Sequence, residues 1–456
     1  MAEKQKTKEV DLGVGSVGKL LFNLAVPAIA AQIINVLYNM VDRMYIGHLP
    51  GVGANALTGV GITFPIITAI SAFAALVSMG GAPRASIMLG KGDKDMAERI
   101  LGNCASALII VSIVLTVFLQ IFGRQILMIF GASENTIDYA WEYMQIYALG
   151  TISVQLTLGL NAFINAQGYA KMGMFTVVIG AILNIILDPV LMFVFDMGVA
   201  GAAWATIISQ TVSAIWVVWF LLSGKSYLRL RPGKMRIQGE ILLPAIALGS
   251  APFVMQFTES ILNVCFNTSL QRYGQDMAVG AMTICSSVMQ FCTLPLSGMC
   301  QGGQPLISFN YGAGKIKRVE KTFYLLLATS LGYSTLMWVL SMFTPNLFTS
   351  VFTQDAALTD YTVWAMRIYM AMSLLMGAQL ACQQTFIALG DSKTSLFLAL
   401  LRKVILLIPL IYILPLFIEN KVMAVFLAEP IADTIAICTT VTLFFRALKK
   451  LKKKGA

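Results

Sequence analysis

Charged residues are scarce in this chain of 456 residues. Only 12% of it is Asp, Glu, Lys or Arg, about half the share in a soluble domain, whereas 57% is hydrophobic and the mean hydropathy is +0.77. Such a chain cannot cover a water-exposed surface with charge. The composition therefore excludes an ordinary cytosolic enzyme, a disordered protein and a collagen-like fibre, and it indicates a polytopic membrane protein.

Residues that commonly build metal centres or nucleophile–base pairs are also few. His48 is the single histidine, and none of the seven cysteines forms a CxxC pair. We expect the cysteines to be free thiols packed among helices, with neither a disulfide framework nor a zinc site. The motifs HExxH and GxSxG do not occur. We therefore predict that the protein is not an enzyme and holds no cofactor.

Twelve apolar stretches are long enough to cross a membrane, which takes about 20 residues in a helix. The predicted fold class is an all-α polytopic membrane protein with twelve transmembrane helices. We place the spans at 20–46, 55–80, 97–122, 136–164, 172–195, 199–222, 240–270, 276–303, 317–343, 357–388, 394–418 and 421–447.

Basic residues are distributed unevenly between the two sides of these spans. Twenty-five of the 32 Lys and Arg residues fall in the two termini and in the loops on the same side, and four fall on the opposite side. Because basic loops stay in the cytoplasm, we expect both termini to be cytoplasmic. The net charge of +10 then reflects orientation and not a nucleic-acid partner, and the basic C-terminal tail is expected to rest on anionic membrane lipids.

The two halves of the sequence resemble each other at an interval of 222 residues. Gly-Gly-Ala-Pro at 80–83 matches Gly-Gly-Gln-Pro at 302–305, and Ala-Gln-Gly at 166–168 matches Ala-Leu-Gly at 388–390. A duplicated unit of six spans gives two parallel lobes with a central cleft, as in many transporters. The predicted parts are an N-terminal lobe at 1–222, a cytoplasmic linker at 223–239, a C-terminal lobe at 240–447 and a basic tail at 448–456.

Polar side chains follow one face of the first span and one face of the seventh. The two stripes match each other across the repeat, and they consist of Gln32, Asn35, Asn39 and Asp42 in the first span and Gln256, Glu259 and Asn263 in the seventh. A polar face in lipid is costly, so both stripes are candidates for the cleft walls. The alternative is that the amides pair between packed helices.

Carboxylates within the spans are candidate sites for a coupling H⁺ or Na⁺, because protonation or a bound cation removes the cost of burying their charge. They are Asp42, Asp188, Glu259, Glu429 and Asp433, and Asn184 lies one turn before Asp188. Other interpretations stay open for two of them. Asp42 can pair with Arg43 or meet water, and Glu429 can lie at a helix break before Pro430, near the outer surface.

Two adjacent basic residues, Arg402 and Lys403, fall inside the eleventh span. Unpaired charge at that depth is expensive. They either face a water-filled cavity or pair with an acid such as Glu259, and Arg402 is also a candidate for a substrate contact.

Four segments resemble the multidrug and toxic compound extrusion (MATE) family, near its MepA-like bacterial branch. They read LAVPAIAAQIINVLYNMVDRMYIGHL, GAILNIILDPVLMF, MGVAGAAWATIIS and GQPLISFNYGAGKIKRV. The resemblance covers nearly the whole chain. It implies a bacterial inner-membrane exporter that acts as a monomer by alternating access and exchanges amphipathic, often cationic compounds for H⁺ or Na⁺.

The same resemblance implies roles for particular residues. Those similar to the family's cation site are Asp42, Asn184, Asp188 and Thr206, with Tyr38, Tyr143 and Asn161 as neighbours. Glu259 is similar to an acid of the NorM-like branch. The tenth span departs from that branch, since it carries Gln379 and Gln383 where an Asp is expected. These glutamines are assigned to the substrate cleft.

The substrate stays open from the sequence alone. A flippase for lipid-linked sugars or other amphipathic lipids would favour a cationic cleft, and a dedicated metabolite exporter would share the same architecture. A channel fits less well than a carrier, because the repeat and the scattered carboxylates are typical of alternating access.

Overall fold

The computed structural model describes residues 11–352 and 355–455, which form helices and loops with no strand among them. In the first half these are α1 (Val17–Gly47), α2 (Gly53–Gly90), α3 (Lys94–Ile129), α4 (Ile137–Leu149), α5 (Thr151–Ala166), α6 (Ala170–Pro189), η1 (Val190–Val194), α7 (Gly198–Leu222) and η2 (Pro232–Lys234). In the second half they are α8 (Gly239–Gly312), α9 (Ile316–Phe343), α10 (Pro345–Phe352), α11 (Ala356–Tyr369), η3 (Ser373–Leu375), α12 (Met376–Ala388), α13 (Ser392–Leu400), η4 (Leu401–Leu407), α14 (Ile408–Phe417) and α15 (Lys421–Gly455).

These elements make twelve membrane spans. Within the described residues, nine helices are long and apolar enough to cross a membrane, and two bent pairs raise the number to eleven. The bent pairs are α4 with α5, at 58°, and α11 with η3 and α12, at 51°. The twelfth comes from the 74-residue α8, which reverses at Gln275, where φ is 54° and ψ is −155°. The predicted all-α fold with twelve spans is confirmed.

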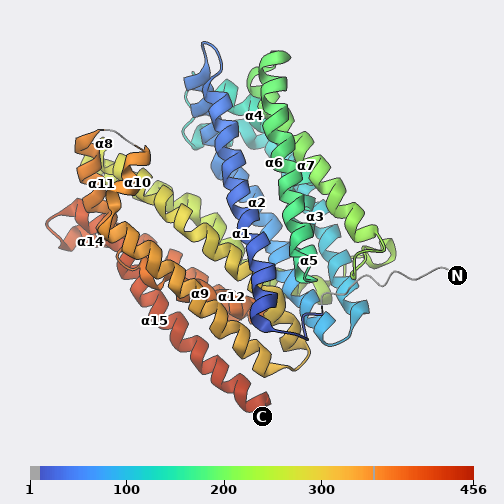
Figure 1. Cartoon of the computed structure of the whole chain (residues 1–456). Helices are drawn as coiled ribbons and strands as arrows, with labels where there is room; N and C mark the ends of the chain where they lie inside the picture. The colour runs from blue at the N-terminus through green and yellow to red at the C-terminus, as the bar shows by residue number, and fades with distance from the viewer. Residues whose placement is uncertain (1–10, 353–354, 456) are drawn as a thin grey trace.

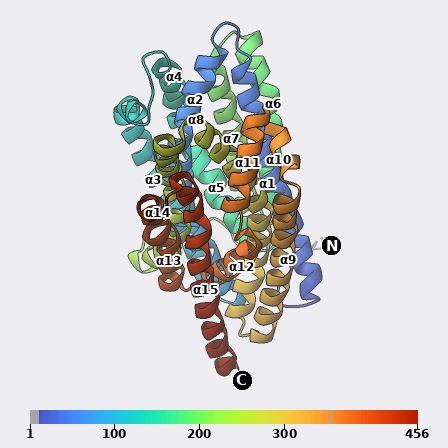
Figure 2. The same cartoon turned by 90° about the vertical axis from the view of Figure 1, so that its left-hand side faces the viewer.

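The spans form two lobes, α1–α7 and α8–α15, which lie side by side. Figure 1 shows the lobes in contact at the end where α1 begins and α15 ends, and diverging toward the opposite end. The view at right angles shows the second half of the chain in front of the first, with α15 extending past the lobe to the C-terminus (Figure 2). α7 ends at Leu222 and α8 begins at Gly239; the exact lobe boundaries stay a prediction.

Glycines allow the two lobes to touch through their backbones near the termini. A Cβ atom on Gly80 of α2 would overlap the carbonyl of Ala245 in α8, and one on Gly249 would overlap the carbonyl of Leu76. Another crossing lies closer to the termini, where Gly312 of α8 lies against Ile87 of α2. Since side chains are absent at these crossings, the helices approach closely and form a compact seam.

The segment before α1 is bound by the other lobe. The Arg318 guanidinium at the start of α9 donates to the carbonyl of Gly15 at 2.8 Å and to that of Leu12 at 3.2 Å. The Lys315 ammonium donates to the carbonyl of Gly13 at 2.9 Å, and the Asn310 amide donates to Leu12 at 3.0 Å. These bonds hold the start of the first lobe against the α8–α9 loop of the second.

The linker between the lobes is attached to α3 through a buried carboxylate. The Glu98 side chain is 2% exposed, and its carboxylate forms salt bridges with Lys234 at 2.7 Å and with Arg231 at 3.1 Å. Ser106 donates to the carbonyl of Met235 at 2.5 Å. Two of the five basic residues of the linker, Arg231 and Lys234, thus attach it to the first lobe.

Cysteine placement differs from the expectation at one position. Six of the seven cysteines are buried, but Cys438 is exposed.

Replacing Glu98 by Gln should lower the free energy of unfolding by about 1–3 kcal/mol, because Lys234 and Arg231 lose a buried charged partner. Thermal unfolding in detergent would measure this loss. Asp95→Asn is the matched control, since Asp95 also binds Lys234 but its side chain is 58% exposed. An equal drop in both variants would show that the buried carboxylate has no special role.

Candidate functional site

The first candidate site lies inside the N-terminal lobe, between α6 and α7. The Asn184 amide donates to the Asp188 carboxylate at 3.0 Å and lies 3.4 Å from the Thr206 hydroxyl of α7. All three side chains are buried. The four-residue spacing of Asn184 and Asp188 puts them on one face of α6, so the amide orients the carboxylate as the sequence predicts.

Asp42 of α1 adds a second carboxylate to this group. It is buried and lies within electrostatic range of Asp188. Tyr38 and Tyr143 lie within range of Asp42, and Tyr143 also meets the Thr206 side chain. The structure therefore brings together Asp42, Asn184, Asp188 and Thr206, with two of the three expected neighbours. The alternative that Asp42 simply meets water is wrong.

Several oxygens at this site are buried without a hydrogen-bond partner in the protein. They include one oxygen each of Asp42, Asn184 and Asp188. Two ionised carboxylates close together in a low-dielectric interior repel each other, and each loses its hydration. A proton or a small cation at these oxygens would relieve both costs, so the donor set fits H⁺ or Na⁺.

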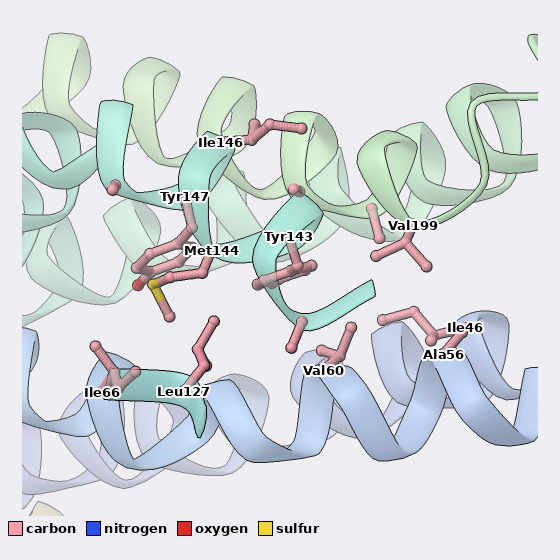
Figure 3. Packing of buried hydrophobic residues seen from close by; sticks show 14 of the residues in the cluster. Ile46, Ala56, Val60, Ile66, Leu127, Tyr143, Met144, Ile146, Tyr147 and Val199 are labelled. Carbon is pink, nitrogen blue, oxygen red and sulfur yellow. The ribbon is translucent and has the colours of Figure 1, made fainter. Parts of the chain in front are cut away.

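An apolar layer encloses the site on one side. Figure 3 shows Tyr143, Met144 and Tyr147 of α4 projecting between α2 and α7, with Val60 and Val199 beside them. The Tyr143 and Tyr147 rings stack with centroids 6.1 Å apart. This layer keeps water from that side of the carboxylates.

The helix changes its winding directly after Asp188. Pro189 has no N–H, so the carbonyl of Ile185 loses its usual helical partner. The chain continues as the π-helical segment η1. π-segments are frequent at functional sites, because they redirect side chains within a span.

A second polar group lies inside the C-terminal lobe and consists of paired charges. Arg402 of η4 donates to Asp433 at 2.6 Å and to Glu429 at 3.3 Å, both on α15. Lys403 donates to the Glu259 carboxylate and, at 2.9 Å, to the carbonyl of Met255. We call these five charged residues the C-lobe ion-pair cluster.

Two glutamines of α12 border this cluster. Gln379 donates to Gln383 at 3.4 Å, and Gln383 approaches the sulfur of Met255 at 3.2 Å. Both glutamines are buried. Met255 thus contacts Gln383 through its sulfur and Lys403 through its carbonyl, which links the expected glutamines to the charged cluster.

Comparisons with known proteins agree with this two-lobe arrangement. The MatE family model matches residues 27–190 and 252–413, one segment in each lobe. The chain belongs to the MatE family. The family consists of membrane transporters, so this chain is a multi-pass membrane transporter.

Among curated relatives is the multidrug export protein MepA of Staphylococcus saprophyticus, 24% identical over 399 residues, with 88% of this chain and 87% of the relative covered. MepA of Staphylococcus aureus is 26% identical over 404 residues, with 87% of each chain covered. Among solved structures, MATE in a bent conformation matches with a TM-score of 0.92 and 21% identity, covering 98% of this chain and 99% of that one. A transporter of the wider superfamily from Pyrococcus furiosus matches with a TM-score of 0.90, 21% identity and the same coverage.

One residue expected at the MATE site, Asn161, lies elsewhere. The Asn161 amide of α5 donates to the carbonyl of Gly173 at 3.2 Å. Gly173 precedes Asp188 by about 22 Å along α6 at the helical rise. Asn161 is therefore not a neighbour of the two carboxylates.

The polar residues of the α1 stripe have different surroundings. Gln32 donates to Gln301 of α8 at 3.2 Å, which is the helix-to-helix pairing considered as the alternative. Asn39 donates to the carbonyl of Asn35 within α1. Asn35 is exposed.

On the stripe of α8, Glu259 and Asn263 are exposed and Gln256 is partly buried. Gly249 of the same span contacts Leu76 of α2, and Gln256 and Asn263 follow it at intervals of seven residues, so this face of α8 turns towards the first lobe.

One alternative for the charged residues is wrong, and another is confirmed. Glu429 does not lie at a helix break near the surface, because α15 continues through Pro430 and Glu429 is buried against Arg402. The expected pairing of the two cations with acids is confirmed, since Lys403 pairs with Glu259 and Arg402 binds Glu429 and Asp433. Adjacent residues of a helix point about 100° apart, so the two side chains reach partners on two different spans.

Two residues of the C-lobe interior were missing from the expected site. Lys403 was considered only together with Arg402, and its pairing with Glu259 depends on η4. Tyr369 lies within electrostatic range of Glu429 and Glu259. It is offset by the repeat interval from Tyr147, so the internal repeat is the signal that could have found it.

Replacing Arg402 by Met should lower the free energy of unfolding by about 3–5 kcal/mol, since Glu429 and Asp433 stay buried without a counter-charge. Thermal unfolding in detergent would report it. The triple variant Arg402→Met, Glu429→Gln and Asp433→Asn should regain most of the loss. If Arg402→Met alone unfolds at the same temperature as the wild type, the assignment of Arg402 as the buried counter-ion is contradicted.

Proposed function

We propose that this protein is a secondary active multidrug exporter that exchanges amphipathic, often cationic compounds for H⁺ or Na⁺. The observation that carries the proposal is the buried pair of Asp42 and Asp188, whose unpartnered oxygens suit a proton or a small cation. The two MepA relatives support the drug-export part, because they are named multidrug export proteins.

The proposed setting is a bacterial inner membrane with both termini in the cytoplasm, as the distribution of basic residues favours. The end at which the lobes touch then faces the cytoplasm, and the end at which they diverge faces outward (Figure 1). A monomeric transporter is part of this proposal. Neither requires a resident cofactor in this proposal.

Alternating access would require the cytoplasmic seam to open. The backbone contacts of Gly80 and Gly249 would have to separate, and Arg318 would have to release the segment before α1. An ion entering from outside would occupy Asp42 and Asp188 and favour drug release. The drug would then bind again from the cytoplasm after the seam opens.

Charge balance limits how the membrane potential can drive this exchange. Moving one elementary charge gains roughly 2.3 kcal/mol per 100 mV. Exchange of one H⁺ for one monovalent drug cation moves no net charge, so the pH difference alone would drive it. A second ion would add dependence on voltage.

A flippase for lipid-linked sugars fits the contacts less well. Pyrophosphate carries several negative charges and would need a site with excess positive charge, whereas the charge of Arg402 is offset by two carboxylates and that of Lys403 by Glu259. A dedicated metabolite exporter would use the same machinery, and a transport assay with drugs distinguishes it.

Asp188→Asn should abolish ethidium uptake into proteoliposomes driven by a pH or Na⁺ gradient, because the amide cannot take up the coupling ion. The measurement is ethidium fluorescence under each gradient separately, which also identifies the ion. Asp196→Asn is the matched control, since Asp196 is exposed in the loop after η1. It should transport as the wild type does.

Uptake by Asp188→Asn at the wild-type rate under the active gradient would overturn the proposed coupling role of Asp188. A wild type that takes up no dye under either gradient would overturn broad multidrug antiport. A flippase or a dedicated metabolite exporter would then be the better assignment.

A further inference from the structure

The pairing of Glu259 with Lys403 leaves one side of each group available. The Glu259 side chain is 59% exposed, whereas that of Lys403 is 10% exposed. Lys403 uses two of the three donors of its ammonium, one for Glu259 and one for the Met255 carbonyl. Glu259 uses one of its two oxygens for Lys403. One donor and one acceptor therefore remain side by side.

The exposed edge of this pair faces the space between the diverging lobes. A carboxylate in the middle of a span is disfavoured against lipid. Glu259 lies on the stripe with Gln256 and Asn263, which continues the face of α8 that meets α2 of the first lobe at Gly249.

Lys403 is the cation that neutralises Glu259. The neighbouring Arg402 is bound to Asp433 and Glu429. These bonds direct its guanidinium towards α15, whereas Lys403 binds Glu259 directly. A drug cation that approaches Glu259 therefore meets a carboxylate that already has a fixed ammonium next to it.

The internal repeat makes the difference between the lobes explicit. At the repeat interval, Asp188 corresponds to Leu410 and Thr206 corresponds closely to Glu429. In the N-terminal lobe the carboxylates keep unpartnered oxygens. In the C-terminal lobe the acids bind Arg402 and Lys403 of the protein itself, so their charge is balanced without an external ion.

We propose that the Glu259–Lys403 pair is a substrate-selecting subsite for zwitterionic compounds, and that Lys403 determines this specificity. The free oxygen of Glu259 receives the substrate's cationic group, and the remaining donor of Lys403 receives its carboxylate. Simple monocations bind more weakly, because the ammonium of Lys403 repels them and already offsets the charge of the Glu259 carboxylate. This inference rests on the proposed exporter function and specifies its substrate class.

The test compares two fluorescent probes, a rhodamine with a free carboxylate and its methyl ester, which is a monocation of nearly the same shape. Binding to the purified full chain in detergent is measured by fluorescence anisotropy, without any ion gradient. The wild type should bind the zwitterion more tightly. Lys403→Met should bind the ester about tenfold more tightly than the wild type does, and the zwitterion no more tightly.

Two variants serve as controls. Lys393→Met removes an exposed lysine at the start of α13 and should leave the ratio of the two affinities unchanged. In the double variant Glu259→Gln with Lys403→Met, the tenfold gain for the ester should disappear. Lys403→Met strands no buried charge, since Glu259 is exposed, and thermal unfolding would verify its fold.

An unchanged affinity ratio in Lys403→Met would overturn the inference, as would a gain that persists in the double variant. The outcome is separable from the proposed antiport. Gradient-driven ethidium uptake by the wild type together with an unchanged ratio would reject this subsite alone. The predicted ratio shift together with undiminished uptake by Asp188→Asn would reject the coupling site alone.

Discussion

The cost of an unpaired charge inside the membrane governs the two polar interiors of this protein. An ionised carboxylate in the middle of a span needs a proton, a cation or a paired side chain. The C-terminal lobe meets this need with its own residues, since Arg402 binds Glu429 and Asp433. The N-terminal lobe leaves Asp42 and Asp188 with unpartnered oxygens. The two lobes thus differ in how their buried carboxylates are neutralised: the C-terminal lobe uses its own cations, and the N-terminal lobe leaves oxygens free for an external ion.

The contacts between the lobes use backbone atoms and hydrogen bonds from cations to carbonyls, such as that of Arg84 in α2 to Ile241 in α8. Near the termini, α2 and α8 touch through glycines and backbone atoms, and Arg318 binds carbonyls of the segment before α1. Backbone contacts and single hydrogen bonds can be exchanged for similar ones after a rigid-body movement. The charged clusters lie within the lobes, so such a movement would leave them intact. This separation is suited to a transporter whose lobes move as units.

The sequence predicts much of this architecture, because long apolar stretches and a repeat interval depend on local pattern. The Asn184–Asp188 contact is also predictable, since a four-residue spacing fixes one helical face. Thr206 was placed by family resemblance. Pairing of Arg402 and Lys403 with acids is predictable from the cost of unpaired charge, but which acid each one binds is not, because that depends on how α8, η4 and α15 pack. Asn161 and Gln32 found other partners for a similar reason, since their contacts depend on how whole helices pack.

The most direct test of the central claim is to count the protons or sodium ions that leave the protein when a cationic dye binds in weakly buffered detergent. Wild-type protein should release the ion. The release should vanish in a variant with both Asp42→Asn and Asp188→Asn, and it should persist when Arg402, Glu429 and Asp433 are neutralised together. Release that survives the first change and disappears with the second would contradict the division of roles between the lobes.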